Sequence, residues 1–446
     1  MSYWVTRTQQ AVGQGGFHTA SIDFCPNWCD PPFSWDGLGC LHEHSTTRYV
    51  YDCGEYGRSR SNVLPAVAAY VQALNGADLD VLFISHAHAD HTNAINDLIL
   101  AIQKSEGRVK TIVLPLLNPL ERLVAYVQSA EPEDGTIEGL ALDILIDPVT
   151  ALSPLAADLV FIVGDGDAPD DFDVDPDDQN DNDPSDGDND LRALVERLPF
   201  KLEGGSLVRQ GGVVTLSHTV NIVLTNPNRS WSNSEDDWCL RTFIDPNVFD
   251  QKTAFVTELK RRLQSKTPPA DHLVDKLTVS AMRELLTTYA DDLTKAYEAA
   301  ITPKDVNVTS MSLYSGPRYP SRRGKGRLRI GGGIIPAGSA KGWLLTGDAC
   351  LGVRNRLDKF LQHFDEIRRT VAVLTLPHHG SVHNFGIDLL GRWSARALYT
   401  TNANPPANWR HPDSLVVNAV SSIGARMHTV TDAELSTIEF TAGNAI

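Results

Sequence analysis

Three histidines and one aspartate lie within six residues of the chain, in the pattern His86-x-His88-x-Asp90-His91. The apolar segment 80–85 precedes them and is expected to form a short buried strand, on which alternate side chains share a side, so His86 and His88 can bind one ion. Apolar residues at helical spacing follow, so Asp90 and His91 are expected near a helix start, directed at a second ion. Imidazole and carboxylate groups are ligands that zinc accepts readily. Because four such groups would be costly to bury without partners, the pattern favours a metal site over a strand with coincidentally alternating histidines.

The order of further motifs narrows the class of protein. The pattern HxHxDH resembles the metal-binding motif of the metallo-β-lactamase superfamily, and other motifs follow in that family's order: VGQG at 12–15, DCG at 52–54, TGD at 346–348, PHHGS at 377–381 and HP at 411–412. The first two and the last of these are similar to the DNA-uptake (ComEC-type) branch. The resemblance implies an α/β fold of the αββα sandwich type and leaves the middle of the chain unmatched.

The same resemblance implies the remaining members of the site. Asp348 is expected to bridge both ions. Either His378 or His379 is expected to be the last ligand of the second ion. His378 is preferred as this ligand, and His379 is then expected to contact the ligands without binding the ion. His218 is the candidate for a further ligand of the first ion, because it is the one histidine in a strand-like segment between the motifs. His411 is expected to donate a hydrogen bond or a proton to the substrate, and the alternative is a simple turn residue.

The chemistry follows from the two ions, for which Zn²⁺ is expected and Mn²⁺ is the alternative. Ions held roughly 3.5–4 Å apart would bind a bridging water and lower its pKa towards neutrality, which makes hydroxide available as a nucleophile. Asp90 and Asp348 are the expected catalytic carboxylates, and the PHHGS and HP motifs favour phosphodiesters. The sequence therefore favours a dinuclear phosphodiesterase or nuclease that acts on nucleic acid or a nucleotide. Because this fold hosts many reactions, a hydrolase of another ester or lactone and a non-catalytic regulatory protein are the alternatives.

Charge is spread unevenly along the chain. Residues 164–190 contain 13 aspartates and no Lys or Arg, and they account for most of the net charge of −17. This segment has too few apolar residues to offset the entropy of ordering, so it is expected to be a disordered acidic surface loop. Calcium binding, or mimicry of nucleic acid that covers the site, are the alternatives.

A basic segment contrasts with this acidic loop. Residues 318–329 include Arg322, Arg323 and Lys325 and are expected on a hairpin near the rim of the site, where they would contact substrate phosphate. A solvated turn and a partner for the acidic loop are the alternatives.

The rest of the chain is expected to complete one enlarged domain, 1–446. Apolar residues recur at helix-like intervals over 237–300, which predicts a helical insertion. No apolar run reaches about 18 residues, so no membrane span is expected. The first residues do not resemble a secretory signal, which favours a cytoplasmic protein. Such a protein could work with protein partners in a multi-gene prokaryotic system.

The six cysteines are expected to be reduced thiols. Cys25, Cys29 and Cys40 precede His42 and could form a structural zinc knot, although their spacing departs from common Cys-x2-Cys pairs. Ordinary loop and core thiols are the alternative. Cys53 and Cys350 lie beside the motifs and are expected to be buried packing residues.

Overall fold

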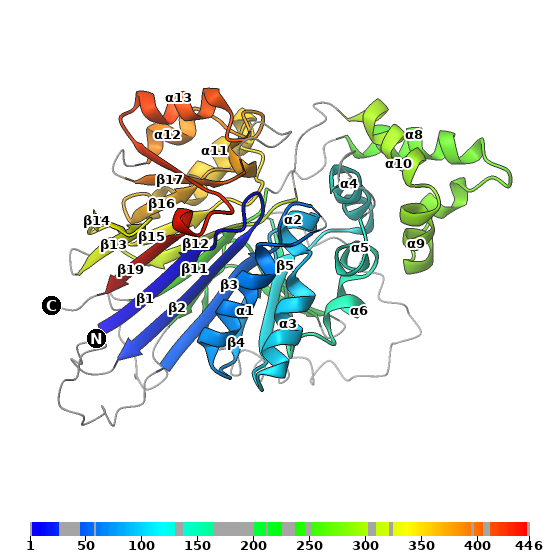
Figure 1. Cartoon of the computed structure of the whole chain (residues 1–446). Coiled ribbons are helices and arrows are strands. Elements are labelled where there is room, and N and C mark those ends of the chain that lie inside the picture. The colour runs from blue at the N-terminus through cyan, green and yellow to red at the C-terminus, as the bar shows by residue number, and fades with distance from the viewer. Residues whose placement is uncertain are drawn as a thin grey trace.

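Two β-sheets pack face to face, and helices cover the outer face of each sheet (Figure 1). The computed structural model describes residues 2–25, 45–57, 59–129, 137–164, 200–210, 213–224, 237–245, 251–301, 309–320, 324–393, 397–404 and 411–443. The expected αββα sandwich is confirmed.

Within the described residues, the first sheet has eleven strands in the order β14-β13-β19-β1-β2-β3-β4-β5-β6-β9-β8. Its strands are β1 (Ser2–Gln9), β2 (Phe17–Cys25), β3 (Ser45–Cys53), β4 (Leu79–Phe83), β5 (Val109–Pro115), β6 (Asp158–Val163), β8 (Leu207–Gln210), β9 (Val213–Ser217), β13 (Lys325–Ile330), β14 (Gly333–Gly338) and β19 (Ile438–Gly443). Strands β3, β4, β5, β6 and β9 are parallel to one another. Strand β1 pairs with the last strand of the chain, β19, in antiparallel orientation.

The second sheet has eight strands in the described part of the chain, in the order β18-β17-β16-β15-β12-β11-β10-β7. Its strands are β7 (Lys201–Glu203), β10 (Asn221–Leu224), β11 (Trp238–Phe243), β12 (Ser312–Pro317), β15 (Gly342–Leu345), β16 (Val371–Thr375), β17 (Leu398–Asn402) and β18 (Arg426–Val430). The four strands from β15 to β18 are parallel, which is usual for strands that helices connect.

The helices form two outer layers. The first sheet is covered by α1 (Val63–Leu74), α2 (Ala89–Thr92), α3 (Ile95–Lys104), α4 (Pro119–Ser129), α5 (Leu140–Ile146) and α6 (Pro148–Leu152). Outside α4 and α5 lie α8 (Lys252–Gln264), η2 (Asp271–Val274), α9 (Val279–Thr287) and α10 (Ala290–Ala300) (Figure 1). The second sheet is covered by α11 (Arg354–His363), η3 (Asp365–Ile367), α12 (Asp388–Arg392) and α13 (Ser414–Ser422). Two further short turns are η4 (His378–Gly380) and η5 (Glu434–Ser436). A separate apolar core fills the space between the sheets.

The helical segment expected over 237–300 begins later than predicted. Strand β11 occupies its first described part, and the helices run from α8 to α10. The β11 sequence WCLRTF is rich in β-branched and aromatic residues, which favour a strand, and it pairs with β10 and β12. The helical spacing of apolar residues starts only at Phe255.

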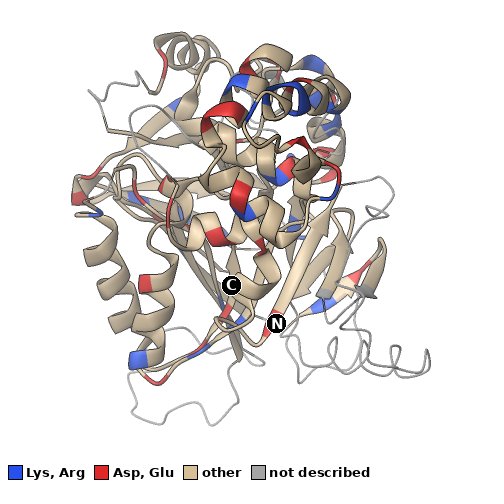
Figure 2. Cartoon of the chain, turned by 90° about the vertical axis from the view of Figure 1, so that its right-hand side faces the viewer, with Lys and Arg blue, Asp and Glu red and all other residues tan. Residues whose placement is uncertain are grey.

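The helices of this segment pack on the first helical layer. Leu259, Leu285 and Leu293 are buried in the core that α4 and α5 share. Gln128 Nε2 of α4 donates to Tyr297 Oη of α10 at 3.1 Å. The exposed helix surfaces carry both signs of charge, as Figure 2 shows, and ion pairs such as Lys266 with Asp292 at 2.6 Å balance them. This surface therefore does not form a single basic face.

Two further predictions concern residues outside the described part of the chain. The acidic loop was predicted over 164–190, and all of it after residue 164 lies outside the described residues. Of the proposed cysteine knot, Cys29, Cys40 and His42 lie outside them as well. Cys53 and Cys350 are buried, as expected. None of the described helices combines the length and the apolar character needed to cross a membrane.

Candidate metal centre

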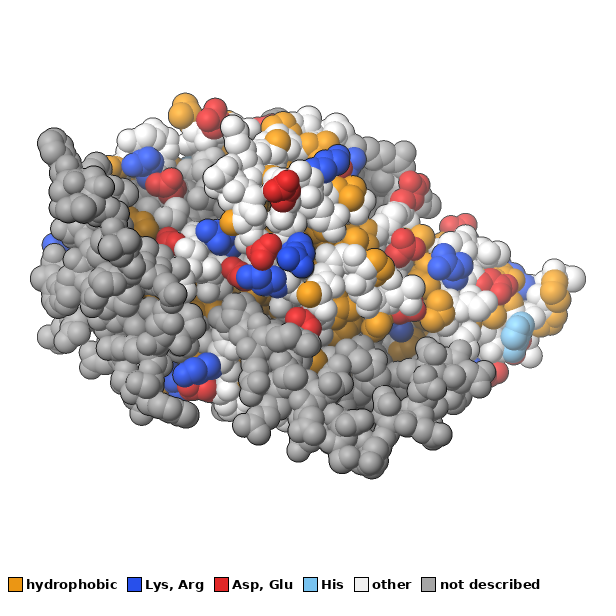
Figure 3. Space-filling model, turned by 90° about the horizontal axis from the view of Figure 1, so that it is seen from below, with side chains coloured by type: hydrophobic (Ala, Val, Ile, Leu, Met, Phe, Trp, Pro, Cys, Tyr) orange, Lys and Arg blue, Asp and Glu red, His pale blue; other side chains and the backbone are white. Residues whose placement is uncertain are grey.

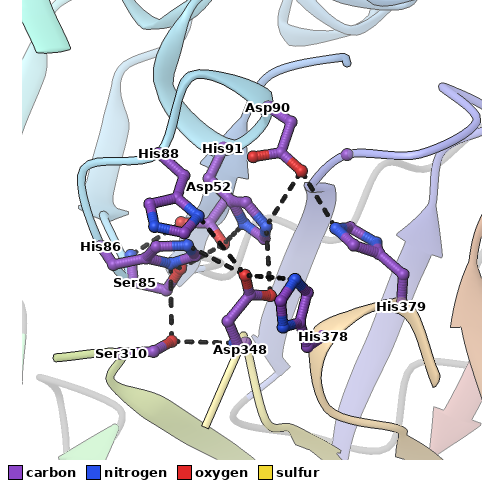
Figure 4. Close-up of polar contacts among 12 residues, drawn as sticks. Asp52, Ser85, His86, His88, Asp90, His91, Ser310, Asp348, His378 and His379 are labelled. Atoms are coloured by element: carbon purple, nitrogen blue, oxygen red, sulfur yellow. Dashed lines mark hydrogen bonds and ion pairs between the residues drawn. The ribbon is translucent and has the colours of Figure 1, made fainter. Parts of the chain in front are cut away.

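The carboxyl ends of parallel strands from both sheets meet at one place. Strand β4 is buried along its whole length, as is usual for a central parallel strand, and its sequence LDVLF is apolar apart from Asp80. His86 and His88 follow this strand, and α2 then carries Asp90 and His91. Asp348 follows β15 of the other sheet, so the two sheets contribute side chains to one cluster (Figure 4). Ligand sites at the carboxyl ends of strands are common in α/β folds.

The first group of candidate ligands joins His86, His88 and Asp348. His86 Nε2 lies 3.2 Å from Asp348 Oδ2, and His88 Nδ1 lies 3.6 Å from the same oxygen. The two histidines thus present different ring nitrogens to one point.

The second group joins Asp90, His91 and His379. His379 Nε2 lies 3.0 Å from Asp90 Oδ2, and His91 Nε2 lies 3.8 Å from that oxygen. His91 Nε2 also lies 3.4 Å from Asp348 Oδ1. Since Oδ2 of Asp348 faces the first group and Oδ1 faces the second, this carboxylate is placed between them.

The donor atoms of these two groups fit divalent ions. The Nε2 atoms of His86 and His91 are buried and make no hydrogen bond within the described residues, which would be costly unless a ligand occupies the point they face. In three of these histidines, the Nδ1 atom contacts a neighbouring polar group. His86 Nδ1 is 2.8 Å from Ser85 Oγ, and His91 Nδ1 is 2.8 Å from Asp52 Oδ2. His379 Nδ1 is 2.8 Å from the Asn402 carbonyl oxygen. This arrangement is typical of metal-binding histidines, whose second nitrogen is fixed by a neighbouring group.

The electrostatics of the cluster favour positive charge at its centre. Burial and the neighbouring His86 hold the pKa of His88 well below its usual value, so this ring is neutral and has a lone pair for a metal. Burial would also lower the pKa of His91, but Asp90 and Asp348 raise it well above its usual value. For Asp348, nearby histidines outweigh burial and lower the pKa. A divalent ion can replace the proton that these carboxylates attract.

Asp52 links both groups, a role that the sequence analysis did not assign. Its carboxylate accepts hydrogen bonds from Ser85 N and Ser85 Oγ at 2.7 Å each and contacts His91 Nδ1 at 2.8 Å. Since Ser85 also contacts His86, one carboxylate orients a histidine of each group. The only sequence signal was its place in the DCG motif.

Gly16, directly after the VGQG motif, and Gly54 of the DCG motif hold the turn that carries Asp90 and His91. Gly16 N donates to the Asp90 carbonyl oxygen at 3.0 Å, and Gly54 N donates to the Gly16 carbonyl oxygen at 2.9 Å. A Cβ atom at Gly54 would lie 2.6 Å from the Asp90 carbonyl carbon, too close for any other residue without movement. The motifs therefore bring the first strands into contact with the candidate ligand turn.

The neighbours His378 and His379 have different partners. Both have left-handed backbones, with φ of 46° and 53°. His378 Nδ1 lies 3.0 Å from Asn384 Oδ1, and its Nε2 lies 3.9 Å from Asp348 Oδ2. The geometry thus places His379, rather than the preferred His378, in the second group.

His218 lies outside the two candidate ligand groups, and His411 lies beside them. His218 Nδ1 lies 2.9 Å from the Ile244 carbonyl oxygen, and its ring packs 5.2 Å from Phe243 and 5.0 Å from His363. It belongs to neither candidate group found in the described part of the chain. The ring of His411 lies 5.8 Å from that of His378, beside the cluster.

The flanks of the basic segment do not border the cluster. Strand β12 begins beside it, where Ser310 Oγ accepts from Asp348 N at 2.9 Å, and then runs away towards Arg318. At about 3.3 Å per residue, Arg318 lies on the order of 20 Å from the cluster. Lys325 pairs with Gly443 at the same far end, which corrects the expected position at the rim. Arg322 and Arg323 lie outside the described residues.

The face at this far end, viewed from below in Figure 3, carries acidic and basic side chains side by side where residues are described. Before β4 and on β5, the partly exposed Asp78 and Lys110 form an ion pair at 3.6 Å. The described part of this face therefore does not form a basic surface.

Part of the chain matches a known family of proteins. Residues 41–214 match the family model of the metallo-beta-lactamase superfamily. That match includes the motif from His86 to His91 and ends before Asp348 and His379. The resemblance to the DNA-uptake branch in particular stays a prediction.

Among solved structures, the chain is similar to the long form of RNase Z from yeast, with a TM-score of 0.22 and 12% identity. The similarity covers 54% of this chain and 27% of that one. Comparison with curated proteins gives no match.

Proposed function

We propose that this protein is a hydrolase that uses two divalent metal ions, with phosphodiesters of nucleic acid or nucleotides as its substrates. The observation that carries the proposal is the position of Asp348, whose two carboxylate oxygens face two separate groups of donor atoms. Zn²⁺ is the ion we favour, because imidazole and carboxylate make up the whole donor set. Mn²⁺ suits the same ligands.

Each side chain has a distinct part in this proposal. Two ions bound here would activate a water molecule and neutralise charge on a phosphate group. Asp348 would hold the two groups at a fixed separation. Asp90 and His379 would complete the ligands of the second ion together with His91. Asp52 would keep His91 in the orientation that directs Nε2 to the centre.

His411 is the candidate contact to the substrate. Its Nδ1 is buried and makes no hydrogen bond to any described residue. Burial, together with His379 and His378, lowers its pKa to about 4, so the ring is neutral at pH 7. A neutral imidazole N–H can donate a hydrogen bond to a phosphate oxygen but is a weak proton donor. We therefore assign His411 to substrate binding and stabilisation of developing charge.

The proposal is tested with the purified full chain. Metal content is measured first, and hydrolysis of single-stranded DNA, RNA, cyclic nucleotides and bis(p-nitrophenyl) phosphate is then compared with hydrolysis of lactones and a chromogenic β-lactam. We expect about two ions per chain and turnover of at least one phosphodiester. Turnover of an acyl substrate alone would show that the phosphodiester assignment is wrong.

Variants separate an enzyme from a non-catalytic protein. Asp348→Asn should abolish turnover, because an amide cannot supply the charge that both groups face. His272→Ala is the matched control, since this exposed histidine lies on η2 in the helical segment. Turnover that persists in Asp348→Asn would contradict the proposed centre.

A further inference from the structure

A small, partly open cavity lies between the two sheets, and some of the candidate metal ligands line it. Its volume is about 30 Å³, and its wall includes His91, Asp348 and His379 together with His18 and Asn402. Neither His18 nor Asn402 belongs to the donor groups described above. Both nevertheless present polar atoms in this buried place.

His18 is a buried histidine for which the proposed reaction has no use. It lies on β2 with 1% of its surface exposed, and its ring packs 4.6 Å from Trp343 and 6.0 Å from Tyr49. Neither ring nitrogen has a hydrogen-bond partner within the described ranges. Burial and the nearby Arg7 hold the pKa of His18 well below its usual value, so the ring is neutral, with one donor and one acceptor nitrogen.

Asn402 connects the same cavity to a candidate ligand. Its backbone carbonyl oxygen contacts His379 Nδ1 at 2.8 Å, and its Nδ2 donates to the Gly15 carbonyl oxygen at 3.0 Å. The side-chain oxygen Oδ1 is buried and, counting described residues only, has no partner. Asn402 is therefore held on two sides and has one acceptor that faces no donor of the described chain.

Physical chemistry limits what can satisfy these atoms. Buried polar groups nearly always have a hydrogen-bond partner, and an unpaired one is costly. A cavity needs roughly 10–15 Å³ to hold one water molecule, so this cavity has room for about two. An apolar ring at position 18 would pack between Trp343 and Tyr49 without any polar cost, so a histidine here is understandable only if something polar meets it.

We propose that this cavity is a water-binding site, in which ordered water joins His18 to the side-chain oxygen of Asn402 and thereby fixes His379. In this arrangement the His18 N–H donates to water, and water donates to Asn402 Oδ1. The amide of Asn402 is then held at all its polar atoms, so its backbone carbonyl keeps the direction that His379 Nδ1 requires. His18 is thus a positioning residue that acts through water and does not touch a metal ion.

The direct test is a high-resolution crystal structure of the full chain. We expect a water molecule within roughly 2.7–3.2 Å of a His18 ring nitrogen and within a similar distance of Asn402 Oδ1. A cavity without water density, or a His18 nitrogen bonded to another protein group, would overturn the proposal. This arm requires no enzymatic activity, so its outcome is independent of the proposed hydrolysis.

The positioning role is tested with Co²⁺ as a spectroscopic probe. In His18→Phe the second Co²⁺ should bind about tenfold more weakly, with an altered visible spectrum, as expected when a group behind a metal-binding histidine is lost. His18→Gln keeps a donor and an acceptor and should restore binding and spectrum. Wild-type affinity and spectrum in folded His18→Phe would contradict the positioning role. Should His18→Phe not fold, His18→Gln must still show the cavity water and the wild-type spectrum, and loss of either would contradict it.

Discussion

His378 and His379 are neighbours in the chain, yet their side chains turn to different partners. His379 lies between the Asn402 carbonyl oxygen and Asp90, while His378 contacts Asn384. The left-handed backbone at both positions separates the two rings, whose centroids are 5.9 Å apart. Only one of the pair is therefore placed among the donor atoms of the second group.

This geometry predicts different effects of two alanine substitutions. His379→Ala should lose most of one bound ion per chain, whereas His378→Ala should retain both with a smaller loss of affinity. Metal stoichiometry after dialysis, measured by atomic emission, checks the difference. Equal losses in both variants, or a greater loss in His378→Ala, would show that His378 is the ligand.

Asp52 offers a second test at the scale of one residue. Asp52→Asn keeps the shape but replaces an acceptor oxygen with an NH₂ group and removes the charge that attracts the His91 proton. We expect metal affinity to fall by roughly 10- to 100-fold, the usual cost of losing such a supporting carboxylate. Isothermal titration of the apoprotein with Zn²⁺ measures it. Asp23→Asn is the control, because Asp23 accepts hydrogen bonds from Ser21 and Thr46 at the far end of β2. Comparable losses in the two variants would argue against a specific role.

At the scale of elements, the glycines at 16 and 54 let β1, β2 and β3 meet the turn that carries Asp90. Gly54→Ala would push a methyl group against the Asp90 carbonyl, where the nearest atom lies at 2.6 Å. We expect a loss of about 1–3 kcal/mol in stability, together with weaker metal binding, since the turn itself must move. Chemical denaturation and metal titration of the variant give both values.

The control for this change is Gly333→Ala on β14, where the nearest atom to a new Cβ is 3.3 Å away and the strand lies at the sheet edge. It should leave metal binding unaltered. Wild-type metal affinity in Gly54→Ala would mean that the turn does not depend on this contact.

Local patterns in the sequence predicted single elements well. The strand before His86 forms, and Asp90 and His91 lie at a helix start as expected, because burial and periodicity act within a few residues. The position of the basic segment could not be predicted from its place in the sequence. The segment precedes Asp348 in the chain, but β12 runs away from the cluster and so places the first residues of the basic segment far from it. The contact between Asp52 and His91 depends on the pairing of β3 with β4, which no local pattern encodes.

On the scale of the whole molecule, the two sheets share the candidate centre. Asp90 and His91 come from the first sheet, and Asp348 and His379 from the second. Without ions, this contact between layers brings buried carboxylates and histidines together at some cost. Metal ions should therefore stabilise the sandwich as well as complete the site.

Removal of metal ions should lower the melting temperature by several degrees. At a free metal concentration of 100 times Kd, binding contributes about 2.7 kcal/mol to the native state. Differential scanning calorimetry before and after chelation checks this, and added Zn²⁺ or Mn²⁺ should restore the original value. A chelated protein with an unchanged melting temperature, shown to contain no metal, would speak against stabilisation by ions at this place.

The division of ligands between the sheets also has a temporal consequence. Synthesis proceeds from the N-terminus, so His86, His88, Asp90 and His91 leave the ribosome more than 250 residues before Asp348. A nascent chain can offer an ion only an incomplete set of donors during that interval. In the proposed function, the two ions can therefore be captured together only after Asp348 has been synthesised.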